Sequence, residues 1–375
     1  MRYYIIAGEP SGDLHGGNLI RELHRLDPEA EIRAWGGELM QSAGAEVVKH
    51  YRDLAFMGFA EVVANLPAIL RNFKFCRKDI ESFRPDVLIL IDYPGFNLRM
   101  AEFAHKEGIK VFYYISPQIW AWKQSRVKKV RAYVDEMYVI LPFEKDFYRK
   151  FGVDVHFVGH PLIDAVDNYH GALIPGGDDA LISAADDPRP LVALLPGSRK
   201  QEISKMLPLM AAAARDFPDY RFVIAGAPSQ EAEYYASLLG GADIPVIFGK
   251  TYAILSRAHA ALVTSGTATL ETAIFKVPQI VCYRGGSISY MLAKNLVKVK
   301  YISLVNLIMD AEVVPELIQS KLSVENLKRE LAVIASPGER RRAMLEAYDR
   351  LYDKLGGVGA SARTAERMLK SLRKD

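Results

Sequence analysis

Small, hydroxylated residues follow a strand-like run near residue 263. In the segment VTSGTATLE (263–271), no side chain from Thr264 to Thr269 is larger than threonine, and the carboxylate Glu271 follows. Bare backbone at the end of a strand lets a ligand approach the main chain. The helix beyond it offers free N–H groups and a positive dipole end. The pattern therefore predicts an anion-binding turn with an acid beside it.

Two further glycine-rich loops follow strand-like runs, IIAGEPSGDLHGG (5–17) and LLPGSRKQE (194–202). Any one of the three loops alone is more often a plain strand–turn–helix junction with a serine or threonine cap. Three of them in one chain favour a ligand site, because open α/β sheets bind ligands at the carboxyl ends of their strands. The candidate residues in these loops are Glu9, Ser11, Gly12, Asp13, Gly197, Ser198, Arg199, Ser265, Gly266 and Thr267.

A single carboxylate, Asp92, ends the apolar run DVLILI (86–91) and stands in the segment IDYPGFN (91–97). A carboxylate at the carboxyl end of a strand points toward the same edge of the sheet as the glycine loops, where it can act as a general base. The alternative is a turn aspartate that caps the following helix. Glu9 and Asp13 are further acids in the first loop.

No Asp-x-Asp sequence occurs in the chain, so the usual carboxylate clamp for a divalent metal on a sugar nucleotide is missing. We expect no metal and no cofactor, and we expect cations and dipoles to stabilise a leaving phosphate instead. Arg199 suits that role, because an arginine at a helix start opposes the helix dipole and indicates an anionic partner. The alternative is a solvated first-turn residue.

The composition is that of a globular protein with an ample core, since half of the 375 residues are apolar and a quarter are charged. A net charge of only +3 argues against a nucleic-acid binder by bulk charge. Two cysteines without metal-ligand spacing fit a reducing cytoplasm. The start, MRYYIIAGEPSGD, lacks the apolar core of a signal peptide, and no uncharged stretch of about 18 apolar residues predicts a membrane span.

Short apolar runs alternate with amphipathic helical patterns, which is the rhythm of a doubly wound parallel sheet. The rhythm occurs twice, so we expect two α/β domains at 1–160 and 161–336 and a charged helical tail at 337–375 that packs on the amino-terminal half. The predicted strands are Arg2–Ala7, Glu31–Trp35, Asp86–Ile91, Lys110–Ile115, Glu136–Ile140, Leu191–Leu195, Arg221–Ala225, Pro245–Phe248, Ala260–Val263 and Gln279–Cys282.

Seven short motifs, in this order along the chain, resemble the lipid-A-disaccharide synthase family. They are AGEPSGDLHGG, IDYPGFN, SPQIWAWK, GHPL, LLPGSR, SGTATLE and SLVNLI. The resemblance implies a glycosyltransferase-B fold, with two Rossmann-like domains facing a cleft. It also implies an inverting transfer from UDP-2,3-diacylglucosamine to 2,3-diacylglucosamine 1-phosphate, which yields a β-1,6-linked disaccharide 1-phosphate and UDP.

The resemblance also implies roles for the candidate residues. Asp92 would take the proton of the acceptor hydroxyl, and Arg199 would neutralise the leaving diphosphate. Thr264–Thr269 would bind the UDP phosphates, Glu271 would accept hydrogen bonds from the ribose, and Asn306 would line the donor site. The residues implied to contact the acceptor or the reacting sugar are Glu9, Ser11, Gly12 and Asp13.

The chain departs from the family pattern at two positions. Many relatives resemble IDAPDFN, with a second acid where Gly95 stands, so Asp92 is the only acid of that motif here. Pro10 replaces the usual small residue of GEASGD, which spares the acids of the loop. Neither change removes a residue with an implied role.

Three alternative functions remain open from the sequence. The nearest is another UDP-sugar enzyme of the same fold, such as a UDP-N-acetylglucosamine 2-epimerase or a peptidoglycan glycosyltransferase. A non-catalytic UDP-sugar sensor is the second. The third is nucleic-acid binding by SPQIWAWKQSRVKKVR (116–131), which has five basic residues between Lys123 and Arg131, but the low net charge and the absence of a binding motif argue against it.

An apolar stripe at helical spacing lies beside basic residues between positions 56 and 78. Arg71, Lys74, Arg77 and Lys78 border the stripe, and Pro67 interrupts it. A core helix is the alternative to a membrane-binding face. Because the implied substrates carry acyl chains, we expect peripheral binding to the cytoplasmic face of the inner membrane; the resemblance also favours a homodimer. The stripe consists of Phe59, Val62, Val63, Leu66, Ile69, Leu70, Phe73 and Cys76, preceded by Phe56.

Overall fold

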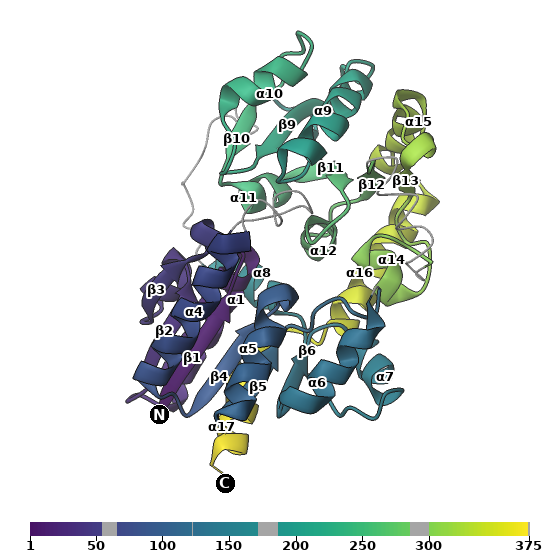
Figure 1. Ribbon diagram of the computed structural model, residues 1–375. Helices are drawn as coiled ribbons and strands as arrows, with labels where there is room; N and C mark the ends of the chain where they lie inside the picture. The colour runs from purple at the N-terminus through teal and green to yellow at the C-terminus, as the bar shows by residue number, and fades with distance from the viewer. Residues whose placement is uncertain (55–65, 122, 172–186, 286–299, 374–375) are drawn as a thin grey trace. The chain divides into compact units, whose positions relative to one another are not determined.

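The computed structural model describes residues 1–54, 66–121, 123–171, 187–285 and 300–373 (Figure 1). Its contacts divide the chain into two compact units. The first unit holds Met1–Ala165 and Leu355–Asp375, and the second holds Val166–Lys354. Each unit is built on its own parallel sheet, which is the α/β architecture expected from the sequence.

The first unit has a seven-stranded sheet in the order β3-β2-β1-β4-β5-β6-β7. Its strands are β1 (Arg2–Ala7), β2 (Glu31–Gly36), β3 (Glu46–His50), β4 (Val87–Ile91), β5 (Lys110–Tyr114), β6 (Glu136–Val139) and β7 (His156–Phe157). Its helices are α1 (Pro10–Leu26), α2 (Glu38–Ser42), α4 (Leu66–Phe83), α5 (Pro94–Lys106), α6 (Val127–Tyr133), α7 (Glu144–Arg149) and α17 (Ala360–Leu372), and α8 (Pro161–Gly171) runs into the second unit.

The second unit has a six-stranded sheet in the order β10-β9-β8-β11-β12-β13. Its strands are β8 (Leu191–Leu195), β9 (Arg221–Gly226), β10 (Val246–Phe248), β11 (Ala258–Thr264), β12 (Gln279–Tyr283) and β13 (Glu316–Ile318). Its helices are α9 (Lys200–Ala214), α10 (Ala232–Leu238), α11 (Thr251–Leu255), α12 (Ala268–Ile274), α14 (Leu304–Met309), α15 (Val324–Ala335) and α16 (Glu339–Lys354).

Strand register brings the candidate loops together within each unit. In the first sheet Ala7 pairs with Ile91, so the loops that start at Gly8 and Asp92 leave neighbouring strands at the same edge. In the second sheet Leu195 pairs with Val263, and the loops after β8 and β11 are adjacent in the same way. The central strands are buried apolar runs, as expected where helices cover both faces of a parallel sheet.

All ten predicted strands are present, but β3, β7 and β13 were not predicted. Strand β3 is a half-buried edge strand with two charged residues in five, so it has no apolar run. Strands β7 and β13 have two and three residues, which is too short for a periodic signal.

The carboxyl-terminal segment is shared between the two units. Helix α17 belongs to the first unit, where the carboxylate of Asp164 caps it by accepting the N–H groups of Gly359 at 2.6 Å and Ser361 at 2.9 Å. Helix α16 belongs to the second unit, where Asp349 pairs with Lys276 at 2.6 Å. The boundaries at 160 and 336 expected from the sequence therefore differ from this division mainly in α16.

Among the described residues, no helix is both long and apolar enough to cross a membrane.

Candidate functional site

The loops after β1 and β4 interlock in the first unit. Gly8 has no side chain, and a Cβ at this position would lie 2.5 Å from the ring of Tyr93. The ring therefore needs the glycine in order to lie against the main chain of the first loop. Glu9 follows directly as the N-cap of α1, and its charge acts on the neighbouring Asp92.

Asp92 lies at the carboxyl end of β4 in a left-handed backbone conformation, with φ of 43°. Burial and, to a smaller extent, the charge of Glu9 raise the pKa of Asp92 to about 7, although a hydrogen bond to the Tyr93 backbone opposes the shift. A carboxylate with such a pKa is able to accept a proton near neutral pH. The position fits the general base expected from the sequence.

Two residues that the sequence analysis did not single out hold the main chain of Asp92. The side-chain amide of Asn97 and the hydroxyl of Tyr113 both donate to the Asp92 carbonyl oxygen, at 2.8 and 2.5 Å. Asn97 stands in the motif IDYPGFN, but its target is a main-chain oxygen, which no motif reveals. Tyr113 comes from β5 and carried no signal in the sequence.

The other candidates of the first loop have different surroundings. Ser11 is exposed, whereas Gly12 packs against β1, since a Cβ there would lie 2.9 Å from the Cβ of Ala7. Asp13 is 2% exposed, and its carboxylate accepts N–H groups from the β2–α2 turn. The donors are Gly37 at 2.7 Å, Leu39 at 3.1 Å and Met40 at 3.0 Å. Asp13 therefore caps α2 and holds the turn, and its proposed contact with the acceptor stays a prediction.

A second buried acid, Glu144, lies beyond the end of β6. Its carboxylate accepts the backbone N–H groups of Ile140 at 3.2 Å and Leu141 at 2.9 Å. Burial raises the pKa of Glu144 to about 7, although these N–H groups and the side chains of Ser116 and Trp120 oppose the shift. Glu144 lies outside the motifs of the sequence, and it connects the segment SPQIWAWK to the end of β6.

In the second unit the loop after β8 is closed by its own helix. Gly197 has φ of 110°, which favours glycine, and Arg199 is the N-cap of α9. The carboxylate of Glu202 accepts the backbone N–H groups of Ser198 and Arg199 at 3.2 and 3.4 Å. The guanidinium of Arg199 is largely exposed and approaches Glu202 at 3.5 Å, a weak surface ion pair. The loop thus presents N–H groups and a cation to an anion, and Glu202 now occupies the N–H groups.

The turn after β11 begins α12. Gly266 and Thr267 are exposed, with open space around the Gly266 Cα. Thr269 is buried, and its hydroxyl donates to the Gly266 carbonyl at 2.8 Å. This hydrogen bond stabilises the turn. The hydroxyl of Ser265 donates to the Ile302 carbonyl at 3.2 Å. Backbone N–H groups at such a helix start precede the first intrahelical bond and are available to a ligand.

Glu271 is oriented by a tyrosine from the preceding helix. The hydroxyl of Tyr252 donates to Glu271 Oε1 at 3.1 Å. Burial raises the pKa of Glu271, and the Tyr252 hydrogen bond opposes that shift. Tyr252 packs against Phe275 with ring centroids 5.3 Å apart. The sequence contained no signal for Tyr252, because the contact joins two helices through the fold.

Asn306 is fully buried, and its side-chain amide is saturated within the protein. Its Nδ2 donates to the Val314 carbonyl at 2.8 Å and to Glu316 at 2.9 Å. Its Oδ1 accepts the N–H groups of Val313 and Val314 at 2.8 and 2.9 Å. Asn306 therefore fixes the connection from α14 to β13 and does not itself offer a group to a ligand. The same connection is continued by Glu316, which accepts the N–H of Ser303 at 2.9 Å.

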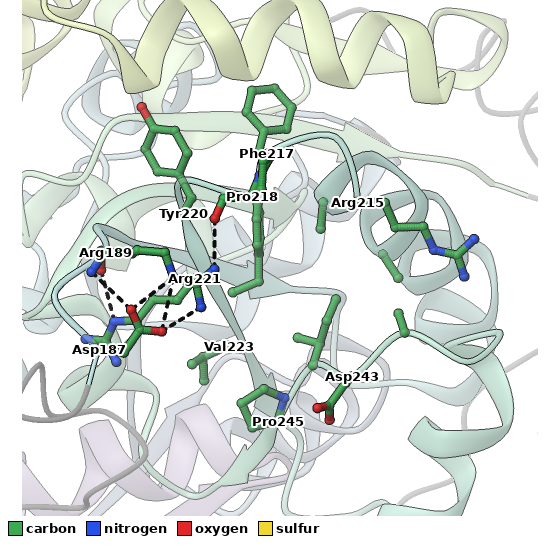
Figure 2. A pocket seen from close by; sticks show the side chains of 15 residues that line it. Asp187, Arg189, Arg215, Phe217, Pro218, Tyr220, Arg221, Val223, Asp243 and Pro245 are labelled. Carbon is green, nitrogen blue, oxygen red and sulfur yellow. Dashed lines mark hydrogen bonds and ion pairs between the residues drawn. The ribbon is translucent and has the colours of Figure 1, made fainter.

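A cavity of about 510 Å³ in the second unit lies away from these loops (Figure 2). Residues at the beginnings of strands β9 and β10 line this cavity. It therefore lies at the amino-terminal edge of the sheet, whereas the candidate turns lie at the carboxyl-terminal edge. Its arginines serve the protein itself: Arg189 pairs with Asp187 at 2.7 Å and donates to the Pro218 carbonyl at 2.8 Å. Candidate residues from the sequence analysis do not line it, so we do not place the site there.

In the parts of the chain that the structure describes, no three His, Cys, Asp or Glu side chains gather closely enough to hold a metal ion.

Comparison with known proteins identifies a family. A family model described as lipid-A-disaccharide synthetase matches residues 3–367. The chain is 40% identical over 377 residues to the lipid-A-disaccharide synthase of Syntrophus aciditrophicus, covering 99% of this chain and 97% of that protein. It is also 40% identical over 383 residues to the lipid-A-disaccharide synthase of Geobacter sulfurreducens, covering 100% and 98%.

Solved structures share the fold at low sequence identity. A UDP-GlcNAc 2-epimerase from Neisseria meningitidis bound to UDP-GlcNAc has a TM-score of 0.67 and 12% identity, with all of both chains covered. The glycotransferase of kitacinnamycin has a TM-score of 0.67 and 15% identity, with 99% of both chains covered. These likenesses show the glycosyltransferase-B fold and nothing finer.

Proposed function

Because this chain belongs to the lipid-A-disaccharide synthase family and is a glycosyltransferase of lipid A biosynthesis, we propose its substrates and the residues that act on them. The donor is UDP-2,3-diacylglucosamine and the acceptor is 2,3-diacylglucosamine 1-phosphate. The acceptor hydroxyl attacks the anomeric carbon, the bond to the UDP oxygen breaks, and the hydroxyl proton goes to a base. The products are the β-1,6-linked disaccharide 1-phosphate and UDP.

The observation that supports this proposal is the position of Asp92 together with the raised pKa of its carboxyl group. Asp92 lies at the end of a strand and has a pKa of about 7. A large fraction of its carboxyl group is therefore ionised at neutral pH, and the carboxylate is basic enough to take a proton. An α-linked donor and a β-linked product require one displacement, and one base suffices for it. Glu9 supports Asp92 by raising its pKa.

The second unit supplies the groups that bind the donor and stabilise the leaving UDP. The N–H groups of Ser198, Gly266 and Thr267 and the guanidinium of Arg199 receive the diphosphate, because preorganised dipoles and a cation suit developing negative charge. Glu202, which now accepts the N–H of Ser198 at 3.2 Å, gives up this bond when phosphate binds. Glu271 accepts the ribose hydroxyls, and Asn306 keeps the neighbouring segment in place.

We propose that this transfer needs no divalent metal, since Arg199 and the turn at 264–269 supply the required charge and dipoles. The test measures UDP release in EDTA and again after addition of magnesium. Unchanged release in EDTA supports the proposal, and loss that magnesium restores contradicts it.

A groove on the first unit is the proposed contact with the membrane. It has a volume of about 630 Å³ and is lined by Leu70, Phe73, Lys74, Arg77, Lys78, Glu81 and Arg99. Leu70 is 55% exposed, and the lysines and the arginine at 77 are exposed beside it. Cations next to an apolar surface suit an anionic leaflet, at about 1 kcal/mol each near the surface.

Only part of the stripe expected from the sequence is available for this contact. Phe73 is 8% exposed and stacks on Phe96 with centroids 4.3 Å apart, and Cys76 is fully buried. Both belong to the core, because they lie on the face of α4 that packs against the sheet. Phe56, Phe59, Val62 and Val63 lie outside the described residues, as does the side chain of Leu66.

The experiment that tests the activity incubates the protein with both diacylglucosamine substrates. Mass spectrometry of the product and a coupled assay for UDP read the outcome. The expected result is a disaccharide 1-phosphate and one UDP per disaccharide. Release of UDP from the donor without the acceptor, or epimerisation of UDP-N-acetylglucosamine, contradicts the proposal. The homodimer implied by the resemblance is part of the proposal, and sedimentation velocity measures it.

A further inference from the structure

Two consecutive residues at the end of β4 have a left-handed backbone. Asp92 has φ of 43° and Tyr93 has φ of 47°. This conformation is uncommon for residues other than glycine, because Cβ crowds the backbone. It persists only where surrounding groups hold it, and such outliers gather at functional sites.

The main chain of Asp92 is held from three sides. Asn97 Nδ2 reaches the carbonyl oxygens of Asp92 at 2.8 Å, Ile91 at 3.1 Å and Ile6 at 3.4 Å. The Tyr113 hydroxyl donates to the Asp92 carbonyl at 2.5 Å. The Asp92 N–H donates to the carbonyl of Tyr114 at 3.3 Å. Helix α5 and strand β5 thus both hold the main chain of Asp92, and Asn97 also links it to the Ile6 carbonyl of β1.

The buried side-chain amide of Asn97 donates hydrogen bonds but accepts none. Its three neighbours are carbonyl oxygens, so the nitrogen must face them. Its Oδ1 is buried without a hydrogen-bond partner, and the residue is fully buried. An orphaned buried acceptor costs stability. Asn97 thus lowers the stability of the folded protein through its unpaired oxygen. Its amide nitrogen, in contrast, donates to the Ile91 and Asp92 carbonyls.

We propose that Asn97 and Tyr113 are positioning residues that hold Asp92 in its left-handed conformation and so direct its carboxyl group toward the acceptor hydroxyl. This inference rests on the proposed role of Asp92 as the general base. The physical reason is that the carbonyl and the side chain of Asp92 share one Cα. A carbonyl fixed by two strong donors restricts the rotation that would carry the carboxyl group away.

The test compares two substitutions of one chemical kind. Tyr113→Phe removes the hydroxyl that holds Asp92. Tyr138→Phe is the control, because Tyr138 is equally buried in the neighbouring strand and its hydroxyl has no hydrogen-bond partner. We expect Tyr113→Phe to lower kcat by roughly 10–100-fold, as for a misplaced reacting group, with KM for both substrates within about twofold. Tyr138→Phe should leave kcat within about twofold of the wild type.

A double variant links the effect to Asp92. In the Asp92→Asn background the base is absent, so Tyr113→Phe should lower the residual rate no further. An equal further loss would show that Tyr113 acts elsewhere and would overturn the inference. A wild-type kcat for Tyr113→Phe, or a rise in KM alone, would overturn it too. Near-normal turnover of Asp92→Asn would instead reject the proposed base.

Folding is checked for each variant by far-UV circular dichroism and the thermal midpoint. If Tyr113→Phe does not fold, Asn97→Ser takes its place under the same criteria, since serine keeps a short hydroxyl but cannot reach three carbonyl groups. The same loss of kcat at constant KM is expected. An unchanged kcat in folded Asn97→Ser overturns the inference.

Discussion

The charge of Glu9 acts on the carboxyl group of Asp92 and, after burial, is the second cause of its pKa of about 7. The two acids stand at the ends of neighbouring strands, β1 and β4, whose register places Ala7 opposite Ile91. A base of this pKa is active when it is deprotonated. The pair therefore predicts the pH dependence of turnover.

Replacing Asp92 by asparagine should lower turnover by ~10²–10⁴ while the fold stays intact, the usual range for loss of acid–base catalysis. UDP release under saturating substrate measures the effect, and Asp154→Asn at an exposed position is the control. A folded Asp92→Asn protein with near-normal turnover would reject the assignment.

The same substitution should not lower stability. Because the folded-state pKa of Asp92 is raised from 3.8 to about 7, the folded protein holds this proton more tightly than the unfolded chain. The contribution to stability is therefore fully present below about pH 4 and is lost as the pH rises to about 7. Thermal midpoints of Asp92→Asn at pH 7 should equal or exceed those of the wild type.

Glu9→Gln should move the acid limb of the pH–kcat/KM profile to lower pH. The wild-type rate should fall as the pH drops below about 7, because protonated Asp92 cannot accept a proton. Removal of the Glu9 charge takes away one cause of the raised pKa, but burial remains and the shift should be partial. Glu107→Gln, an exposed residue at the far end of α5, is the control. An acid limb that stays in place would show that Glu9 does not act on the base.

Arg199→Ala should lower kcat by roughly 10–10³, because one charge-assisted contact to the leaving diphosphate is lost. Stability should change little, since the Arg199–Glu202 pair is long and exposed. Steady-state kinetics with both substrates measure the effect, and Lys321→Ala at an exposed position in the same unit is the control. An unchanged kcat would remove Arg199 from the proposed mechanism.

Acid should destabilise the first unit through two buried histidines. Burial lowers the pKa of His15 to about 4, opposed by the charge of Asp164; burial and the charge of His15 lower the pKa of His160 to about 3. The unfolded chain binds these protons near pH 6.5, so stability is present above that pH and falls as the pH drops toward 4. Urea unfolding between pH 7 and 4 measures the slope.

A matched pair of variants distinguishes the effect of the buried histidines on stability from other effects of acid. His15→Gln should flatten the loss of unfolding free energy between pH 6.5 and 4, because one buried titrating group is removed. His105→Gln, at an exposed position, should leave the slope unchanged. Equal slopes in the two variants would contradict the role of the buried histidines.

The groove on α4 should bind anionic vesicles at low salt. Replacing Leu70 by serine and Lys74, Arg77 and Lys78 by glutamine should weaken cosedimentation, because the variant loses an exposed apolar side chain and three exposed cations. The control replaces three exposed cations of helix α7 and its C-cap, Lys145, Arg149 and Lys150, by glutamine.

The salt dependence completes this test. Binding of the wild type should fall as the ionic strength rises, since exposed charges are screened. A wild-type protein that does not cosediment with anionic vesicles at low salt would show that the groove does not contact a membrane.

Local patterns in the sequence were sufficient for ten strands and for the glycine-rich loops, but not for β3, β7 and β13. Apolar runs such as 87–91 and 191–195 indicate strands, because a strand of a parallel sheet is buried on both faces and is therefore apolar throughout. Glycine and small residues directly after these runs predicted where the chain could approach a ligand. Both signals lie within about ten adjacent residues, so they need no knowledge of the fold.

The roles of Asp13 and Asn306 could not be deduced in that way. Each stands in a motif beside candidate ligand residues, yet each is buried and bound to backbone groups. The partners of Asp13 lie 24 to 27 residues away in the β2–α2 turn. A side chain at a helix start has the same sequence pattern whether it caps a distant turn or faces a ligand.

By itself, the sequence determined ten of the strands and their order, the three glycine-rich turns and the acid at position 92, because each depends on neighbours in the chain. Only the tertiary structure decided which acids keep a proton near neutral pH and which groups hold them. Burial and the approach of Glu9 set the pKa of Asp92, and Tyr113 reaches its carbonyl from a strand 21 residues away. Desolvation and hydrogen bonds depend on distances in space, and these exist only after the chain has folded.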